Sequence, residues 1–258
     1  NAETLTSAQK VNLNDLLKSK NVASTSTTIV DPEYTYIYFE IIFKYNSNRT
    51  TLNSSELQTR VKDTLRTFNV EELEKFNVVF RHSNLLTSID RTDTSIISSL
   101  ARVAVYKNLN LADISNISSS FNFNFQLDGS VDQNESMLSS DSFRQNNFNV
   151  RIGDQSLNAT QRRIYTYRLD ADRNEVKVDS DVGTLTPSTG EINFSAIFSD
   201  SQPTIKLYAL PSSNDIVAKR NTLLQIDSDK SVVRADKDTV SISGAAGATD
   251  YITYNRQD

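Results

Sequence analysis

The side chains best suited to bind a metal ion form a closely spaced run of oxygen donors. Asp170, Asp172 and Asn174 occupy the first, third and fifth positions of a calcium-binding loop. Asp181 falls at the twelfth position, where such a loop has its last ligand. However, Glu175 stands at the sixth position, where the loop needs glycine for its sharp turn. The run also joins two alternating apolar segments, so we favour an Asp- and Asn-rich hairpin turn over a calcium site.

The single histidine is the next candidate for chemistry. A catalytic imidazole needs a positioned partner, either a nucleophile or an orienting carboxylate. His82 follows Arg81 just before a predicted helix, and the sequence places no such partner for it. We therefore expect His82 to have a structural or surface role.

Four carboxylates flank a short apolar strand near the end of the chain. They are Asp227, Asp229, Asp236 and Asp238. Two acids on either side of a glycosidic bond can hydrolyse it. Acidic residues at both ends of a hairpin are also common without any catalytic role, and we favour that interpretation.

Composition excludes several other kinds of site. The 258 residues include no cysteine, one histidine and six scattered glycines. Thiolate chemistry, cysteine-ligated or multi-histidine metal sites and a glycine-rich phosphate loop are therefore excluded. The net charge of -5 argues against nucleic acid as a partner, and no apolar run is long enough to span a membrane. We expect no cofactor and no small-molecule substrate. Because the chain opens on Asn1 without a signal sequence, we expect a fragment or a processed product.

Residues 34–45 predict one strongly marked β-strand. The odd positions from Ile37 to Tyr45 are all apolar, whereas the even positions begin with Tyr34, Tyr36 and Tyr38. This period of two is typical of a strand with one buried face. The three tyrosines could stack on sugars or bases. We favour a half-buried contact with a helix or a neighbouring subunit, because tyrosine is common at interfaces that remain partly hydrated.

The remaining patterns predict an α+β protein. Serine, threonine and asparagine account for 82 of the 258 residues, and these side chains favour strands, turns and helix caps. Residues 1–30 read as a lead-in segment with a short helix. Residues 31–115 predict a small α/β domain of strand, helix, helix and strand, in which Asn53 caps the first helix. Residues 116–258 show short alternating runs, which predict a β-rich antiparallel domain that could be subdivided.

Several segments resemble one family of phage proteins. The segments are DPEYTYIY (31–38), FKYNSN (43–48), KFNVVFRHSNLLTSID (75–90), ARVAV (101–105) and PSSNDIVAKRNTLLQID (211–227). They resemble the large baseplate wedge subunits of T-even-like contractile-tailed phages, which are related to baseplate J-like proteins. The similarity is good over residues 30–110 and looser in the β-rich half. The J-like portion expected upstream is absent, which fits a C-terminal fragment.

The resemblance implies a structural late protein of the virion, without enzymatic activity. It implies contacts with a second copy of the chain and with other wedge proteins in the ring around the hub. It also implies assembly in the host cytoplasm and a rearrangement when the tail sheath contracts. Tyr34, Tyr36 and Tyr38 are then candidates for the subunit interface.

Two other functions fit parts of the sequence. A glycan- or receptor-binding module of a phage or bacterial surface protein would present a shallow aromatic groove. A glycosidase would hold two acids roughly 5–10 Å apart in a cleft.

Overall fold

A computed structural model describes residues 5–18, 20, 29, 31–114, 119–128, 136–195, 204–219 and 221–239. Within these residues strands outnumber helices, and the chain is an α+β protein rich in antiparallel sheet, as its sequence predicts. The parts of the predicted β-rich domain at 196–203 and 240–258 lie outside the described residues. No helix in the described part of the chain is both long and apolar enough to cross a bilayer.

The first sheet is built around two long strands. In spatial order its strands are β13, β1, β3, β11 and β5, and β14 also pairs with β1. Their bounds are β1 (Glu33–Tyr45), β3 (Ile96–Asn110), β5 (Leu138–Ser140), β11 (Thr204–Ala209), β13 (Thr222–Ile226) and β14 (Val232–Lys237). The strand predicted from the tyrosine-rich alternating pattern is β1, and the prediction of its buried odd face is confirmed.

Two strands of this sheet correct the antiparallel prediction. β13 pairs in parallel with the first half of β1, and β14 pairs in parallel with its second half. The pairings of β1 with β3, β3 with β11 and β11 with β5 are antiparallel. A period of two reports which face of a strand is buried, but it carries no information on strand direction.

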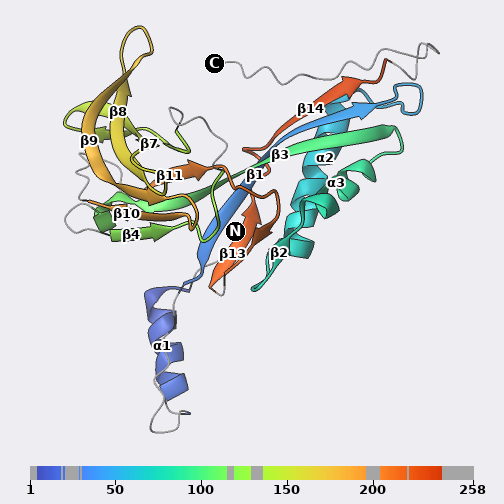
Figure 1. Cartoon of the computed structure of the whole chain (residues 1–258). Helices are drawn as coiled ribbons and strands as arrows, with labels where there is room; N and C mark the ends of the chain where they lie inside the picture. The colour runs from blue at the N-terminus through green and yellow to red at the C-terminus, as the bar shows by residue number, and fades with distance from the viewer. Residues whose placement is uncertain are drawn as a thin grey trace.

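Two helices cover the odd face of β1. They are α2 (Ser54–Phe68) and α3 (His82–Asp90), and Figure 1 shows both against the same side of β1, β3 and β14. The apolar stripe of α2 consists of Leu57, Val61, Leu65 and Phe68, all buried. A π-helical turn, η1 (Asn69–Leu73), follows α2, and β2 (Val79–Phe80) pairs with β12 (Ile216–Val217) beside it. Each fully buried large apolar side chain contributes about 1.5–3 kcal/mol, so this layer is a main source of stability.

The second sheet is antiparallel throughout. Its spatial order is β4, β10, β9, β8, β7 and β6. The bounds are β4 (Ser119–Asn122), β6 (Phe143–Gln145), β7 (Phe148–Ser156), β8 (Arg162–Leu169), β9 (Glu175–Thr186) and β10 (Glu191–Phe194). Where β9 passes β10, a Cβ on Gly183 would lie 2.3 Å from the carbonyl oxygen of Asn193, and φ is +149°. Only glycine fits there without strain.

The two sheets share one hydrophobic core. A short 3-10 helix, η2 (Leu111–Ile114), follows β3 and is buried at Leu111 and Ile114. Ser140 at the end of β5 accepts a hydrogen bond from the backbone N–H of Ile152 in β7 (2.8 Å). Strands from both sides of residue 115 belong to the first sheet, and the boundary expected near that residue stays a prediction.

The predicted lead-in helix is α1 (Ser7–Lys18). None of its residues is buried, and Figure 1 shows the helix below the first sheet. An ion pair joins Lys10 of α1 to Asp31, just before β1.

Candidate subunit interface

The three tyrosines of β1 lie on the sheet face opposite α2 and α3. Strand geometry places them there, because the alternate residues Ile37 and Phe39 are fully buried on the helix side. Tyr34, Tyr36 and Tyr38 are each half-buried. The rings of Tyr34 and Tyr36 are stacked with centroids 6.0 Å apart. The ladder seen in the sequence is therefore one column of a larger surface.

Two further tyrosines from other strands adjoin these rings, of which Tyr106 is buried (3% exposed) and Tyr208 is half-buried. Tyr106 of β3 lies opposite Tyr36, with centroids 4.7 Å apart and rings 9° from parallel. Tyr208 of β11 lies opposite Tyr106, 5.6 Å away in an edge-on arrangement. We call these five residues, Tyr34, Tyr36, Tyr38, Tyr106 and Tyr208, the tyrosine face. The sequence does not reveal the last two as members, because a period of two carries no information on which strands are neighbours.

Lysine side chains lie over the rings of the tyrosine face. The ammonium of Lys230 lies 4.2 Å from the ring centre of Tyr208 and 5.0 Å from that of Tyr38. The ammonium of Lys206 lies 4.5 Å from the ring centre of Tyr106. Such cation–π contacts are worth roughly 0.5–1 kcal/mol each at exposed sites. They hold two cations at fixed positions on the face.

One of the four carboxylates noted near the end of the chain, Asp227, is hydrogen-bonded to the tyrosine face. Asp227 accepts hydrogen bonds from the hydroxyl of Tyr106 (2.7 Å) and from the backbone N–H of Lys230 (2.9 Å). Burial opposes ionisation of this carboxylate, but these hydrogen bonds and the charge of Lys206 outweigh it and lower the pKa of Asp227. Burial and the bond to Asp227 raise the pKa of Tyr106, so its hydroxyl stays protonated as a donor.

The other three acids of that group make local structural contacts. Asp229 forms an ion pair with Arg66 of α2 at 3.0 Å. Asp236 lies opposite Lys44 in the β1–β14 pairing. The backbone N–H of Asp238 donates to the carbonyl of Tyr45 (2.9 Å). These contacts fit the non-catalytic role that we favoured, but the predicted hairpin is wrong, because the flanked strand β14 pairs in parallel with β1.

The calcium-like run forms the turn between β8 and β9. One carboxylate oxygen of Asp170 accepts the backbone N–H groups of Asp172 (2.9 Å) and Asn174 (2.8 Å). Arg173 takes the left-handed conformation that closes the turn. Asp181 lies further along β9, where it faces Arg163 at 3.5 Å. The predicted hairpin turn is confirmed, and no group of three His, Cys, Asp or Glu side chains suited to a metal is found among the described residues.

His82 joins helix α3 to the first sheet. It is the first residue of α3, and its Nε2 lies 2.9 Å from the carbonyl oxygen of Ala101 in β3. Its backbone N–H donates to Asp215 (2.9 Å), which also pairs with Arg81 (2.7 Å). The two hydrogen bonds lower the pKa of Asp215. This is the structural role predicted for His82.

A hollow lies beside the tyrosine face, at its β11 end. Its volume is about 620 Å³. The hollow is lined by Tyr38, Ser139, Ser140, Asp141, Ser142, Arg151, Tyr208 and Lys230. These residues come from both sheets, and apart from Tyr38 none was singled out by the sequence. We call this the cationic hollow, because Arg151 and Lys230 both face it.

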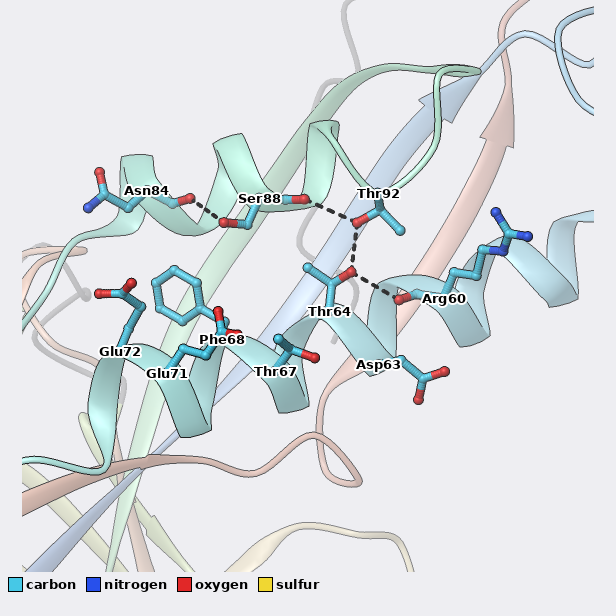
Figure 2. Close-up of a pocket in the computed structure, with 10 residues that line it drawn as sticks. All are labelled: Arg60, Asp63, Thr64, Thr67, Phe68, Glu71, Glu72, Asn84, Ser88 and Thr92. Atoms are coloured by element: carbon cyan, nitrogen blue, oxygen red, sulfur yellow. Dashed lines mark hydrogen bonds between the residues drawn. The ribbon is translucent and has the colours of Figure 1, made fainter.

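A second hollow, of about 440 Å³, lies between α2 and α3. Figure 2 shows one hydrogen bond that crosses this hollow, between Thr64 of α2 and Thr92 just after α3. The hydroxyls of Thr64 and Thr92 are hydrogen-bonded to one another at 2.8 Å. Each hydroxyl oxygen also lies 3.1 Å from a backbone carbonyl oxygen, Thr64 from that of Arg60 and Thr92 from that of Ser88. Because a hydroxyl has one proton, one of the two threonines donates to its carbonyl and the other donates to the partner hydroxyl. This groove is therefore a helix–helix contact.

Comparison with known proteins identifies the part of the chain that carries the tyrosine ladder. Residues 33–108 match a family model described as baseplate structural protein gp6, C-terminal domain III. The chain is similar to a baseplate wedge subunit. The resemblance seen in the sequence is thus confirmed. Residues 33–108 run from the start of β1 almost to the end of β3 and are called the gp6-like segment below.

A curated relative agrees with the family model. The chain is 28% identical over 103 residues to the baseplate wedge protein gp6 of Enterobacteria phage T4. The matched region is 40% of this chain and 16% of that protein, so the chain spans a small part of the length of its relative. Both findings favour a baseplate component over the glycan-binding alternative.

The gp6-like segment holds part of the candidate interface. It contains Tyr34, Tyr36, Tyr38 and Tyr106, together with the helices behind them. Apart from Tyr38, the residues that line the cationic hollow, Tyr208 and Lys230 among them, come from later strands and turns. The interface therefore combines the segment similar to gp6 with residues outside it.

Proposed function

We propose that this chain is a structural component of a phage tail baseplate wedge and works through contacts between subunits. The observation that carries the proposal is the match of residues 33–108 to a gp6 domain. That segment supplies two long paired strands covered on one side by two helices, with a row of tyrosines on the other side. The unit of β1, α2, α3 and β3 serves as the rigid support of the contact surface.

In this proposal the chain contacts a second copy of itself and other wedge proteins in the virion tail baseplate. Its assembly takes place in the host cytoplasm before the tail is complete. The interfaces repack between two arrangements when the sheath contracts, while the sheets stay rigid. The role requires surface complementarity and no reacting group.

The tyrosine face is our proposed subunit interface. Tyrosine provides a large apolar area together with a polar hydroxyl, and it is enriched at interfaces that are partly wet. The rings of Tyr36 and Tyr38 are held in place by Tyr106 and Tyr208, so little side-chain entropy would be lost on binding. Tyr34, near the start of the strand, stacks on Tyr36 at the edge of the array.

Sedimentation velocity across a wide range of protein concentrations tests self-association. We expect the mass to rise from monomer to dimer. The double variant Tyr34→Ala with Tyr38→Ala should weaken the dimer by about 10-fold or more, because buried tyrosines are frequent hot spots. Tyr167→Ala, which removes a half-buried ring from β8 in the second sheet, is the matched control and should leave the dimer unchanged. A strict monomer at the highest concentration would contradict self-contact through this face.

A further inference from the structure

We propose that the cationic hollow binds a carboxylate side chain from an acidic segment of a partner protein. The proposal rests on the function proposed above, because it gives the chemistry of one partner at the same surface. It rests on residues that lie outside both the gp6-like segment and the row of three tyrosines on β1. These are Arg151, Lys230 and the serines of the β5–β6 connection.

Two cations of the hollow lack a carboxylate partner in the described part of the chain. Among the described residues, no carboxylate lies within 4.0 Å of the ammonium of Lys230 or the guanidinium of Arg151. Lys230 is held between the rings of Tyr38 and Tyr208. Its positive charge is therefore fixed at the wall of the hollow and stays available to an incoming anion.

The acid that lines the hollow is already engaged. Asp141 accepts a hydrogen bond from the hydroxyl of Tyr208 (2.8 Å). It also accepts one from the backbone N–H of Lys206 (3.4 Å). Asp227, three residues before Lys230, accepts hydrogen bonds from Tyr106 and from the Lys230 backbone N–H, and Asp229 pairs with Arg66. The two cations thus remain for a negative group from outside.

The chemistry of the walls fits a carboxylate. A guanidinium offers a planar fork of donors that matches the two oxygens of a carboxylate, and an ammonium adds a second charge. Ser139 and Ser142, both exposed, supply hydroxyl donors on the same wall. The hollow is open at the surface, and small-molecule sites usually enclose most of their ligand. An open cationic hollow next to a tyrosine surface suits a protruding side chain of a partner protein.

The overall charge of the chain makes this local positive site more selective. The whole chain carries a net charge of -5, so an acidic partner is repelled at long range. Two cations that face the same hollow attract an acidic segment locally and fix the register of the contact.

Fluorescence anisotropy with a labelled hexaglutamate peptide tests the proposal on the whole chain. We expect saturable binding that weakens as salt is added. The double variant Lys230→Gln with Arg151→Gln should weaken binding at least ~10-fold, because it removes both charges and keeps long side chains. The control pair, Lys219→Gln with Arg49→Gln, removes the same charge from exposed positions outside the hollow and should bind like the unchanged chain. Single variants at Lys230 and Arg151 keep the test valid if the double variant does not fold.

Three results would overturn the proposal. The first is that the Lys230/Arg151 double variant and the control double variant weaken peptide binding equally, which would mean that the peptide is attracted by charge without a specific site. The second is equal binding of a hexalysine peptide. The third is displacement by inorganic phosphate without any binding of hexaglutamate, which would assign the hollow to a small anion. In each case, dimerisation through the tyrosine face in sedimentation would leave the proposed structural function standing.

Discussion

Two ion pairs on neighbouring strands of the second sheet differ in their exposure to solvent. Asp154 and Arg162 are buried, with side-chain exposures of 0% and 6%. Asp154 also accepts hydrogen bonds from the Ser136 hydroxyl and the Leu138 backbone N–H, both at 2.7 Å. It therefore joins the start of β5 to the β7–β8 hairpin. By contrast, Asp181 is 58% exposed in its pair with Arg163.

Replacing each aspartate with alanine should separate these two environments. Asp154→Ala removes the carboxylate that pairs with the buried Arg162 and that accepts three hydrogen bonds. We expect this change to reduce the free energy of unfolding by about 3–5 kcal/mol. Asp181→Ala should cost at most about 1 kcal/mol, because an exposed pair is screened by solvent. Urea unfolding measures both. Equal losses in the two variants would contradict the structural role of Asp154.

The Asp227 carboxylate predicts a dependence of stability on acid pH. Because its pKa is lowered in the folded chain, its contribution is present above the ordinary carboxylate pKa of about 3.9 and is lost as the pH falls through the lower, folded value. Asp227→Asn should be less stable at neutral pH, by about 1–3 kcal/mol. The difference from the unchanged chain should shrink below pH ~4. Chemical denaturation at several pH values would measure this, and a constant difference would contradict it.

Helix α2 begins at a capping box whose two reciprocal hydrogen bonds are formed. The side chain of Asn53 accepts from the Glu56 backbone N–H (3.0 Å), and the Glu56 carboxylate accepts from the Asn53 backbone N–H (2.8 Å). Asn53→Ala should lower the free energy of unfolding by about 0.5–2 kcal/mol. Ser55→Ala, within the exposed first turn, should change it little. A loss at Ser55 as large as that at Asn53 would argue against the cap.

The elements predicted well from the sequence are those whose signals are local. The caps and stripe of α2 and the alternation in β1 depend on residues a few positions apart, and both elements lie where their patterns indicate. Strand pairing depends on residues far apart. Tyr36 faces Tyr106 across 70 positions, and β1 meets β13 almost two hundred positions later. Sequence periodicity carries no information on such pairings. The sequence therefore predicts only Tyr34, Tyr36 and Tyr38 of the tyrosine face.

At the scale of the whole molecule, late strands complete a sheet that early strands begin. Leu207 of β11, Leu224 and Ile226 of β13 and Val233 of β14 are all buried in the shared core. The cationic hollow also joins residues of β1, β5, β7, β11 and the β13–β14 turn. Its members carry no common motif, so only the folded chain brings them together.

This shared sheet predicts how a fragment should behave. A fragment of residues 31–115 lacks the strands that pair with the outer edges of β1 and β3, and we expect it to unfold without a cooperative transition. A fragment of residues 31–239 keeps those strands and should unfold cooperatively. Thermal unfolding followed by circular dichroism distinguishes them. A cooperative transition of the shorter fragment near the temperature of the longer one would support an independent domain ending near 115.

Hydroxyl-radical footprinting of the isolated chain and of assembled baseplates tests the central claim most directly. The account predicts that Tyr34, Tyr36 and Tyr38 react less with radicals after assembly, while Tyr167 in the second sheet keeps its reactivity. Unchanged reactivity of the three tyrosines in the assembled particle would contradict a subunit interface at the tyrosine face.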